Sequence, residues 1–148
     1  MGIFKNTFKN DEDTLSIINI KKATDEINTK TIELAKKLKS ILVAIGCINH
    51  IIELNGEKFV VREIHDNTEM YYYIAILDKC EKEFYLDIDK PVRFYDHIYE
   101  RDIIIFPTLF LANKIFLERA KGIFNEVKTI EEKHIKDCSN ILEQVKDL

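Results

Sequence analysis

The chain changes from helical to strand-like patterning at residues 48–64, which are INHIIELNGEKFVVREI. Two runs rich in Ile, Val and Phe are separated here by the dipeptide Asn55-Gly56. A two-residue hairpin loop of type I′ needs positive φ at both central positions, and Asn and Gly tolerate this better than other residues do. The sequence therefore predicts a β-hairpin with strands over 48–54 and 57–64.

The segment that follows the hairpin continues in short runs of β-branched and aromatic residues with polar breaks between them. Residues 70–77 are apolar or aromatic on both alternating faces, which is typical of a strand covered on two sides. Residues 84–88 alternate cleanly, 92–95 form another candidate strand, and 97–106 fit either a strand or a buried helical turn. We expect an antiparallel β-meander or small barrel of four to five strands over about 47–106.

The segment before the hairpin has the periodicity of a long helix. Its start at Asp11-Glu12-Asp13 is acidic, which complements the positive end of a helix dipole, and Gly46 is a suitable C-terminal stop. Between these points, apolar or small residues recur with alternating spacings of three and four, as in a coiled-coil seam. We predict a helix over about 11–46. Its seam consists of Ile17, Ile20, Thr24, Ile27, Thr31, Leu34, Leu38, Ile41 and Ile45.

A second long helix is predicted after the β region, over about 107–147. Pro107 suits its first turn, where the missing N–H costs no hydrogen bond, and Gly122 is a mild weakness in its interior. The seam of this helix has one extra spacing of four around His134. Its members are Phe116, Ala120, Ile123, Val127, Ile130, His134, Cys138, Ile141, Val145 and Leu148.

These patterns together predict one α+β domain over residues 1–148, since no linker or internal repeat divides the chain. A long helix enters the β region and another leaves it. The simplest arrangement packs the C-terminal helix antiparallel to the N-terminal helix, as a stalk beneath a β head.

The two seams also predict helix pairing, either within one chain or with a second copy in a homodimer. Thr24 and Thr31 stand where a strong coiled coil has Ile, Val or Leu, so the pattern leaves both possibilities open. A homodimer would use the strongest apolar positions of the seams, which are Ile27, Leu34, Leu38, Ile41, Ile123, Val127 and Ile130.

Composition and cysteine usage indicate a soluble cytoplasmic protein. Apolar residues make up 46% of the chain and charged residues 32%, which is typical of a globular protein. Cys47, Cys80 and Cys138 are odd in number and form no Cys-x-x-Cys pair, so we interpret them as reduced thiols. No stretch reaches the roughly 20 apolar residues of a membrane helix. Residues 3–9 are basic and amphipathic but too short to anchor the chain, so we do not expect membrane contact.

The β region carries the negative charge of the chain. Residues 51–106 hold 7 basic and 13 acidic side chains, whereas the rest of the chain is slightly basic. The run Tyr71-Tyr72-Tyr73 cannot point all its rings the same way on one strand, so we expect a ring at the surface. Tyrosines among carboxylates favour a basic protein partner over a phosphate backbone. The candidate partner-binding residues are Tyr72, Tyr85, Tyr95, Glu81, Glu83 and Asp87.

We therefore predict a non-enzymatic protein-interaction module, an inhibitor or adaptor that binds a basic macromolecular partner. The alternative is a single-stranded nucleic-acid-binding protein whose tyrosines stack on bases, although the local acidity makes nucleic acid an unlikely partner.

A metal-dependent enzyme is the second alternative. Glu131 and His134 have the spacing of a di-iron helix motif, and Asp87 with Asp89 follows Asp78 in a loose acidic cluster. Each pattern occurs once and lacks further ligands, and the chain has no glycine-rich phosphate loop or nucleophile elbow. We predict no catalytic residues, no metal site and no cofactor.

Overall fold

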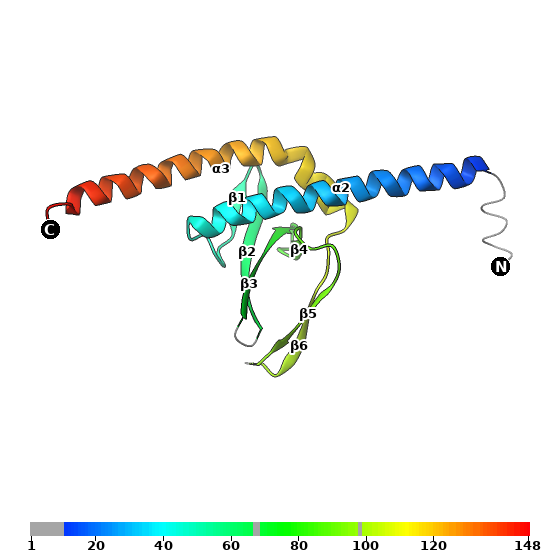
Figure 1. Cartoon of the computed structure of the whole chain (residues 1–148), viewed down its shortest axis with the longest axis horizontal. Helices are drawn as coiled ribbons and strands as arrows, with labels where there is room; N and C mark the ends of the chain where they lie inside the picture. The colour runs from blue at the N-terminus through cyan, green and yellow to red at the C-terminus, as the bar shows by residue number, and fades with distance from the viewer. Residues whose placement is uncertain (1–10, 67–68, 98) are drawn as a thin grey trace.

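The computed structural model describes residues 11–66, 69–97 and 99–148. Two long helices, α2 (Asp11–Ala44) and α3 (Phe110–Val145), form a bar, and the strands between them in sequence form a head that projects from its middle (Figure 1). The free ends of the two helices point in opposite directions. The predicted α+β class and the order helix, β region, helix are confirmed.

The head contains two open antiparallel sheets. The first has the strand order β1-β2-β3-β4, which confirms the predicted meander, and the second is the hairpin β5-β6. Residues 97–106, which fit a strand or a helix in the sequence, contain strand β6. The strands are β1 (Ile52–Leu54), β2 (Glu57–Asp66), β3 (Glu69–Leu77), β4 (Glu83–Tyr85), β5 (Val92–Asp96) and β6 (Arg101–Ile105).

Local sequence signals set the end of α2 and the turn of the first hairpin. Asn55 and Gly56 have φ values of 51° and 82°, as the predicted type I′ turn requires. Before the hairpin, Gly46 has a φ of 79°, and the N–H groups of Gly46 and Cys47 donate to the carbonyls of Val43 and Leu42. This pair of hydrogen bonds is the Schellman motif, so α2 ends at the predicted glycine.

The turn of this hairpin docks on α3 beside Gly122. The N–H of Asn55 donates to Glu126 Oε2 at 2.9 Å, and Arg119 Nη1 donates to the carbonyl of Asn55 at 3.0 Å. A Cβ at Gly122 would lie only 2.5 Å from Asn55 Nδ2. The side chain of Asn55 therefore occupies the space that a side chain at position 122 would fill.

The main core lies between the two helices and one face of the four-stranded sheet. The rings of Phe59 and Phe116 meet edge to face there, with centroids 6.0 Å apart. Burial of such side chains is the dominant stabilising term, at roughly 1.5–3 kcal/mol each. The buried members are Ala35, Leu38, Leu42, Leu54, Phe59, Val61, Ile74, Ile76, Leu86, Phe116, Ile123 and Val127.

The two helices run parallel, so the predicted antiparallel stalk is wrong. Asn113 Nδ2 donates to Asn28 Oδ1 at 2.8 Å, and further along both helices Lys37 Nζ lies 5.7 Å from the ring centroid of Phe124. The contacts advance in the same direction on both helices. The physical reason is the route of the chain, because the strands return it from the end of α2 to the middle of α2 before α3 begins (Figure 1).

The residues predicted to hold a homodimer are largely used within the chain. Leu38, Ile123 and Val127 are buried in the main core, and Leu34, Ile41 and Ile130 pack against it. Ile27 is half-buried. These side chains join α2, α3 and the sheet of one molecule.

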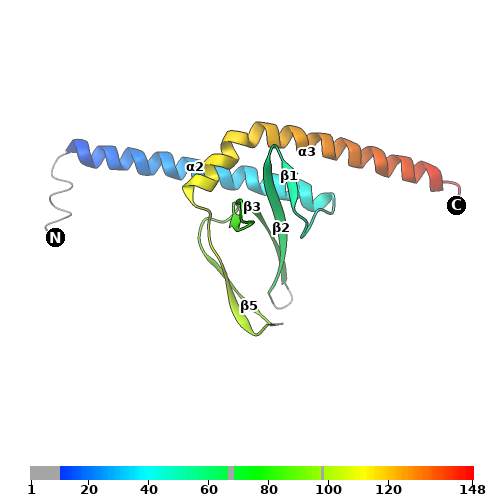
Figure 2. The ribbon, with the colours of Figure 1, turned by 180° about the vertical axis from the view of Figure 1, so that it is seen from behind.

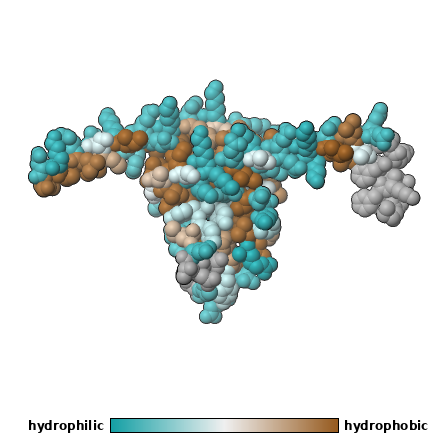
Figure 3. Space-filling view, in the orientation of Figure 1, coloured by the Kyte–Doolittle hydropathy of each residue, from teal (hydrophilic) through white to brown (hydrophobic). Residues whose placement is uncertain are grey.

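We call the main core together with the β head the body of the protein. Each helix continues beyond the body as an exposed arm. We call residues 11–23 of α2 the N arm and residues 132–145 of α3 the C arm, and every residue in both arms is exposed. Apolar surface is visible on both arms in Figure 3. None of the helices in the described part of the chain has a stretch that is long and apolar enough to cross a bilayer. The amphipathic residues 3–9 lie outside the described residues.

Candidate interaction surface on the β head

Aromatic rings hold the head together between strand β3 and the hairpin β5-β6. The ring centroid of Phe94 in β5 lies 5.5 Å from that of Tyr71 and 6.0 Å from that of Tyr73 in β3. Aromatic pairs at such distances contribute about 0.5–1.5 kcal/mol beyond the area they bury. Two of the three consecutive tyrosines therefore pack inside the head, while Tyr72 packs on the opposite face of β3 against the main core.

Tyr85 and Glu83 belong to a polar cluster within the head. Glu83 accepts hydrogen bonds from Arg62 Nε at 2.8 Å and from Arg62 Nη2 at 3.2 Å, and the Tyr85 hydroxyl donates to Glu83 Oε1 at 3.0 Å. Burial, followed by the charge of Glu83 and this hydrogen bond, raises the pKa of Tyr85 above its ordinary value. The hydrogen bond with Glu83 raises the pKa of Arg62. Both predicted partner-binding residues are thus engaged by their own chain.

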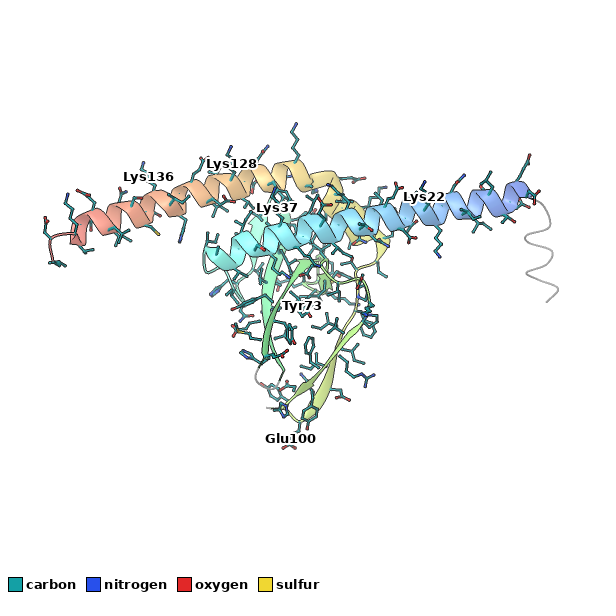
Figure 4. The ribbon with its side chains drawn as sticks, viewed as in Figure 1. Lys22, Lys37, Tyr73, Glu100, Lys128 and Lys136 are labelled. Carbon is teal, nitrogen blue, oxygen red and sulfur yellow. The ribbon has the colours of Figure 1, made fainter. Side chains whose placement is uncertain are left out.

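Asp87 is also engaged within the protein. Its carboxylate is fully buried, accepts a hydrogen bond from the N–H of Ile74 at 3.2 Å and lies 2.6 Å from Lys39 Nζ. Lys39 Nζ is 5.7 Å from the ring centroid of Tyr73, which Figure 4 labels beneath the bar. This cluster ties α2 to β3, and Asp87 cannot face a partner.

Only two of the six predicted partner-binding residues are well exposed, and the structure does not bring them together. Glu81 lies 3.6 Å from Lys58 Nζ at the start of β2, close to the helices. Tyr95 lies in β5, toward the end of the head farthest from the bar (Figure 1).

A different surface lies around Tyr95. Alternate residues of β5 and β6 point away from the buried rings, and the register places Arg93 beside Ile104 and Tyr95 beside Asp102. Tyr95 is 42% exposed, Ile104 39%, and Tyr99 in the connecting turn 71%. We call these five residues the hairpin face.

Polar contacts join neighbouring residues of the hairpin face. Arg93 Nη1 lies 3.5 Å from Asp102 Oδ2, and the guanidinium of Arg101 lies 5.4 Å from the ring centroid of Tyr99. The N–H of Tyr99 donates to Asp96 Oδ1 at 3.2 Å, which fixes the turn. Figure 4 labels Glu100 at the far end of the head, so an acidic residue stands beside the exposed rings.

Sequence reasoning missed Tyr99 and Ile104. Residues 97–106 fit two structures, so the direction of each side chain was undefined. The usable signal was the alternation of Phe94 with Tyr95, which predicts one buried and one exposed ring once residues 92–105 are taken as a hairpin.

Residues of the two patterns considered for the metal-dependent alternative make other contacts. Asp78 Oδ1 accepts hydrogen bonds from the N–H groups of Cys80 and Lys82, both at 2.9 Å, and so closes the turn after β3. His134 Nε2 on the C arm lies 3.6 Å from Cys138 Sγ. Across residues 11–66, 69–97 and 99–148, no group of three or more His, Cys, Asp or Glu is placed to hold a metal ion.

Comparison with models of protein families, with curated proteins and with solved structures finds no match to this chain.

Proposed function

We propose that this protein is a non-enzymatic interaction module that binds a basic protein partner through the hairpin face. The observation that carries the proposal is the exposure of Tyr95, Tyr99 and Ile104 at the far end of the head. Amphipathic rings of this kind supply much of the binding energy in protein interfaces. The surface lies away from the helices, where a partner meets no obstruction from the bar (Figure 1).

The packing beneath the hairpin face supports this role. Phe94 is buried against Tyr71 and Tyr73, so the hairpin has an ordered base before any partner arrives. A surface that is already ordered loses less conformational entropy on binding.

Charge supports a basic partner in particular. The exposed carboxylate of Asp102 lies opposite Tyr95 in the hairpin register and exposed Glu100 follows Tyr99 in sequence, while the β region as a whole has 13 acidic against 7 basic side chains. A negative potential accelerates association with a positive surface and repels a phosphate backbone. An adaptor or inhibitor in the cytoplasm, where the free thiols of the chain stay reduced, fits these features.

A comparison of two variants tests the proposal. Full-length wild type and the double variant Y95A/Y99A, both tagged, are used to capture proteins from the native host lysate with and without nuclease. We expect a partner that survives nuclease and is depleted more than tenfold with the variant, because hot-spot rings contribute about 2 kcal/mol or more each. L15A is the matched control, since Leu15 is exposed on α2, outside the head.

Two outcomes contradict the proposal. If Y95A/Y99A captures every partner as well as wild type does, the hairpin face is not the binding surface. If nuclease removes every partner, the single-stranded nucleic-acid alternative replaces the protein partner.

A further inference from the structure

The two helices are staggered. They are nearly equal in length, at 34 and 36 residues, and run parallel, yet Asn113 near the start of α3 contacts Asn28 in the middle of α2. Figure 2 shows the result, in which α2 continues alone in one direction and α3 continues alone in the other. Along each arm, one helix of the parallel pair therefore continues without the other helix beside it.

The apolar stripe that is buried in the body continues along both arms. On α2 the buried positions Thr31, Ala35, Leu38 and Leu42 are followed outward by Ile27, Thr24, Ile20 and Ile17 at the same spacings of three and four. On α3 the stripe runs from Ile123, Val127 and Ile130 to His134, Cys138, Ile141 and Val145. The uncovered stripes thus continue the faces of α2 and α3 that, in the body, pack in the core shared by the two helices and the sheet.

Each arm carries an apolar stripe that no other element of the described chain covers. Most helical stability in proteins comes from the packing of such an amphipathic face, so a second helix laid along an arm would stabilise it. The N arm spans 11–23 and the C arm 132–145, so each is about 20 Å long. Their nearly equal lengths allow one arm to cover the other.

We propose that the N arm of one molecule pairs in parallel with the C arm of the next, so that copies of this chain assemble head to tail. The pairing repeats the parallel geometry of α2 and α3 in the body. Ile17 then lies beside Cys138, Ile20 beside Ile141, and Thr24 beside Val145.

Two further regions are compatible with this alignment. These are the charged positions beside the seams and the place where the incoming C arm meets α3 of the next molecule. Lys21 and Asp137 fall at the neighbouring e and g positions of the paired seams, where opposite charges stabilise a parallel coiled coil. The incoming C arm ends at Val145, beside Thr24, where the track next to α2 becomes occupied by α3 of the receiving molecule. Exposed Leu109 and Phe110 at the start of that α3 give the incoming end an apolar contact.

The contact joins two different surfaces and is therefore heterologous. A heterologous contact generates an open chain of molecules unless its rotation closes a ring. The proposal is independent of the hairpin face, which lies on the head and takes no part in the arm contact.

A complementation experiment tests the proposal. In full-length protein, I17D/I20D disables the N arm and I141D/V145D disables the C arm, and all four side chains are exposed, so both variants keep the body intact. We expect wild type to form assemblies that grow with concentration in light scattering, each variant to be monomeric, and an equimolar mixture to stop at a dimer. N19D/S139D, which adds two charges on the polar faces of the arms, is the control and should assemble like wild type.

Other outcomes overturn the proposal. Wild type that stays monomeric at all concentrations removes the arm contact altogether. An I17D/I20D protein that dimerises alone shows that C arms pair with each other, and a mixture that stays monomeric shows that the two arms do not pair.

Disulfide trapping tests the alignment of the two arms and does not depend on a substitution that disables an arm. In a chain with C47A and C80S, Cys138 is the remaining thiol, and I17C places a second thiol beside the Cys138 of the next molecule. We expect oxidised I17C to give a ladder of dimers, trimers and longer chains on a non-reducing gel, whereas I20C gives none. Cross-linking of I20C instead of I17C would mean antiparallel arms, and cross-linking of the parent through Cys138 alone would mean paired C arms.

Discussion

Asp87 stands at the centre of the most buried polar contact in the described chain. Its carboxylate holds the ammonium of Lys39 at 2.6 Å and the N–H of Ile74 at 3.2 Å, and its side chain has no solvent exposure. Removing the partner of a buried charge is costly, because the remaining charge keeps its desolvation penalty without the compensating attraction.

Lys39→Met is therefore expected to lower the free energy of unfolding by about 2 kcal/mol, below the usual range for a buried pair because Lys39 is itself partly exposed. Urea unfolding followed by circular dichroism measures this value. Lys36→Met, at an exposed position on the same helix, is the control and should stay within about 0.5 kcal/mol of wild type. Equal effects of the two substitutions would show that the ion pair contributes nothing.

Tyr85 makes stability depend on pH in the alkaline range. Its pKa is raised in the folded state, mainly by burial, above the ordinary value of 10.0 that it has when unfolded. A raised pKa means that the folded state holds its proton longer, so this contribution is present below about pH 10 and is lost as pH rises further. Tyr73, whose pKa burial also raises, acts in the same direction.

We expect the free energy of unfolding to fall above about pH 10, and the fall to be smaller in Tyr85→Phe. The difference between the two proteins should stay below about 1.4 kcal/mol for each pH unit, since the ring is partly screened by solvent. Urea unfolding at a series of pH values gives the two slopes, and tyrosinate absorbance follows the ionisation. Identical slopes would contradict the assignment to Tyr85.

At the scale of residues, the sequence predicted which way a side chain points better than it predicted which residues surround that side chain. Strand alternation places Tyr71 and Tyr73 on one face of β3, and the structure agrees. What covers that face is the hairpin β5-β6, which lies about twenty residues further along the chain, and no local pattern announces the contact. For the same reason Asp87 looked like an exposed carboxylate, since its partner Lys39 is on α2.

At the scale of elements, the docking of the first hairpin on α3 explains why a glycine stands at position 122. Glycine inside a helix costs about 1 kcal/mol relative to alanine, so Gly122→Ala should stabilise an isolated helix. In the folded protein the new Cβ would lie 2.5 Å from Asn55 Nδ2, so the side chain of Asn55 would have to shift. The shift would break the hydrogen bond that Asn55 Nδ2 donates to the carbonyl of Arg119.

We expect Gly122→Ala to destabilise the protein by about 1 kcal/mol, and the same change to be neutral or stabilising when Asn55→Gly has removed the side chain. Thermal unfolding of the four proteins in this double-mutant cycle measures the coupling. Asn55→Gly is a matched background, because glycine also accepts the positive φ of this turn. A stabilising Gly122→Ala in the wild-type background would show that the contact is loose.

The elements themselves were predictable, and their relative placement was not. Asn55-Gly56 and Gly46 fix a turn and a helix end through backbone conformations that few other residues accept. A seam with spacings of three and four is the same for a parallel or an antiparallel partner, in the same chain or in another. The sequence therefore left open both the direction of α3 and the use of Leu38 and Ile123, which the structure places in the core.

At the scale of the whole molecule, the body and the arms are separable. Residues 132–148 are all exposed, and none of them belongs to a core cluster of the described chain. A chain that ends at residue 131 is expected to keep a cooperative thermal transition within about 3 °C of full-length monomer, because surface changes have small effects on stability. Circular dichroism at low protein concentration provides the measurement, and loss of a cooperative transition would mean that the C arm supports the body.

The head projects from the middle of a bar whose two helices are offset by part of their length, and this stagger sets a distance. In a head-to-tail chain each molecule advances the row by about one helix, roughly 54 Å for the 36 residues of α3. The hairpin faces then recur at this interval along a line. A partner with two basic sites at a matching spacing gains from a high local concentration once its first site is bound, so weak single contacts add up to firm attachment. The offset between the helices would in this way set the spacing of binding sites that a multivalent partner must match.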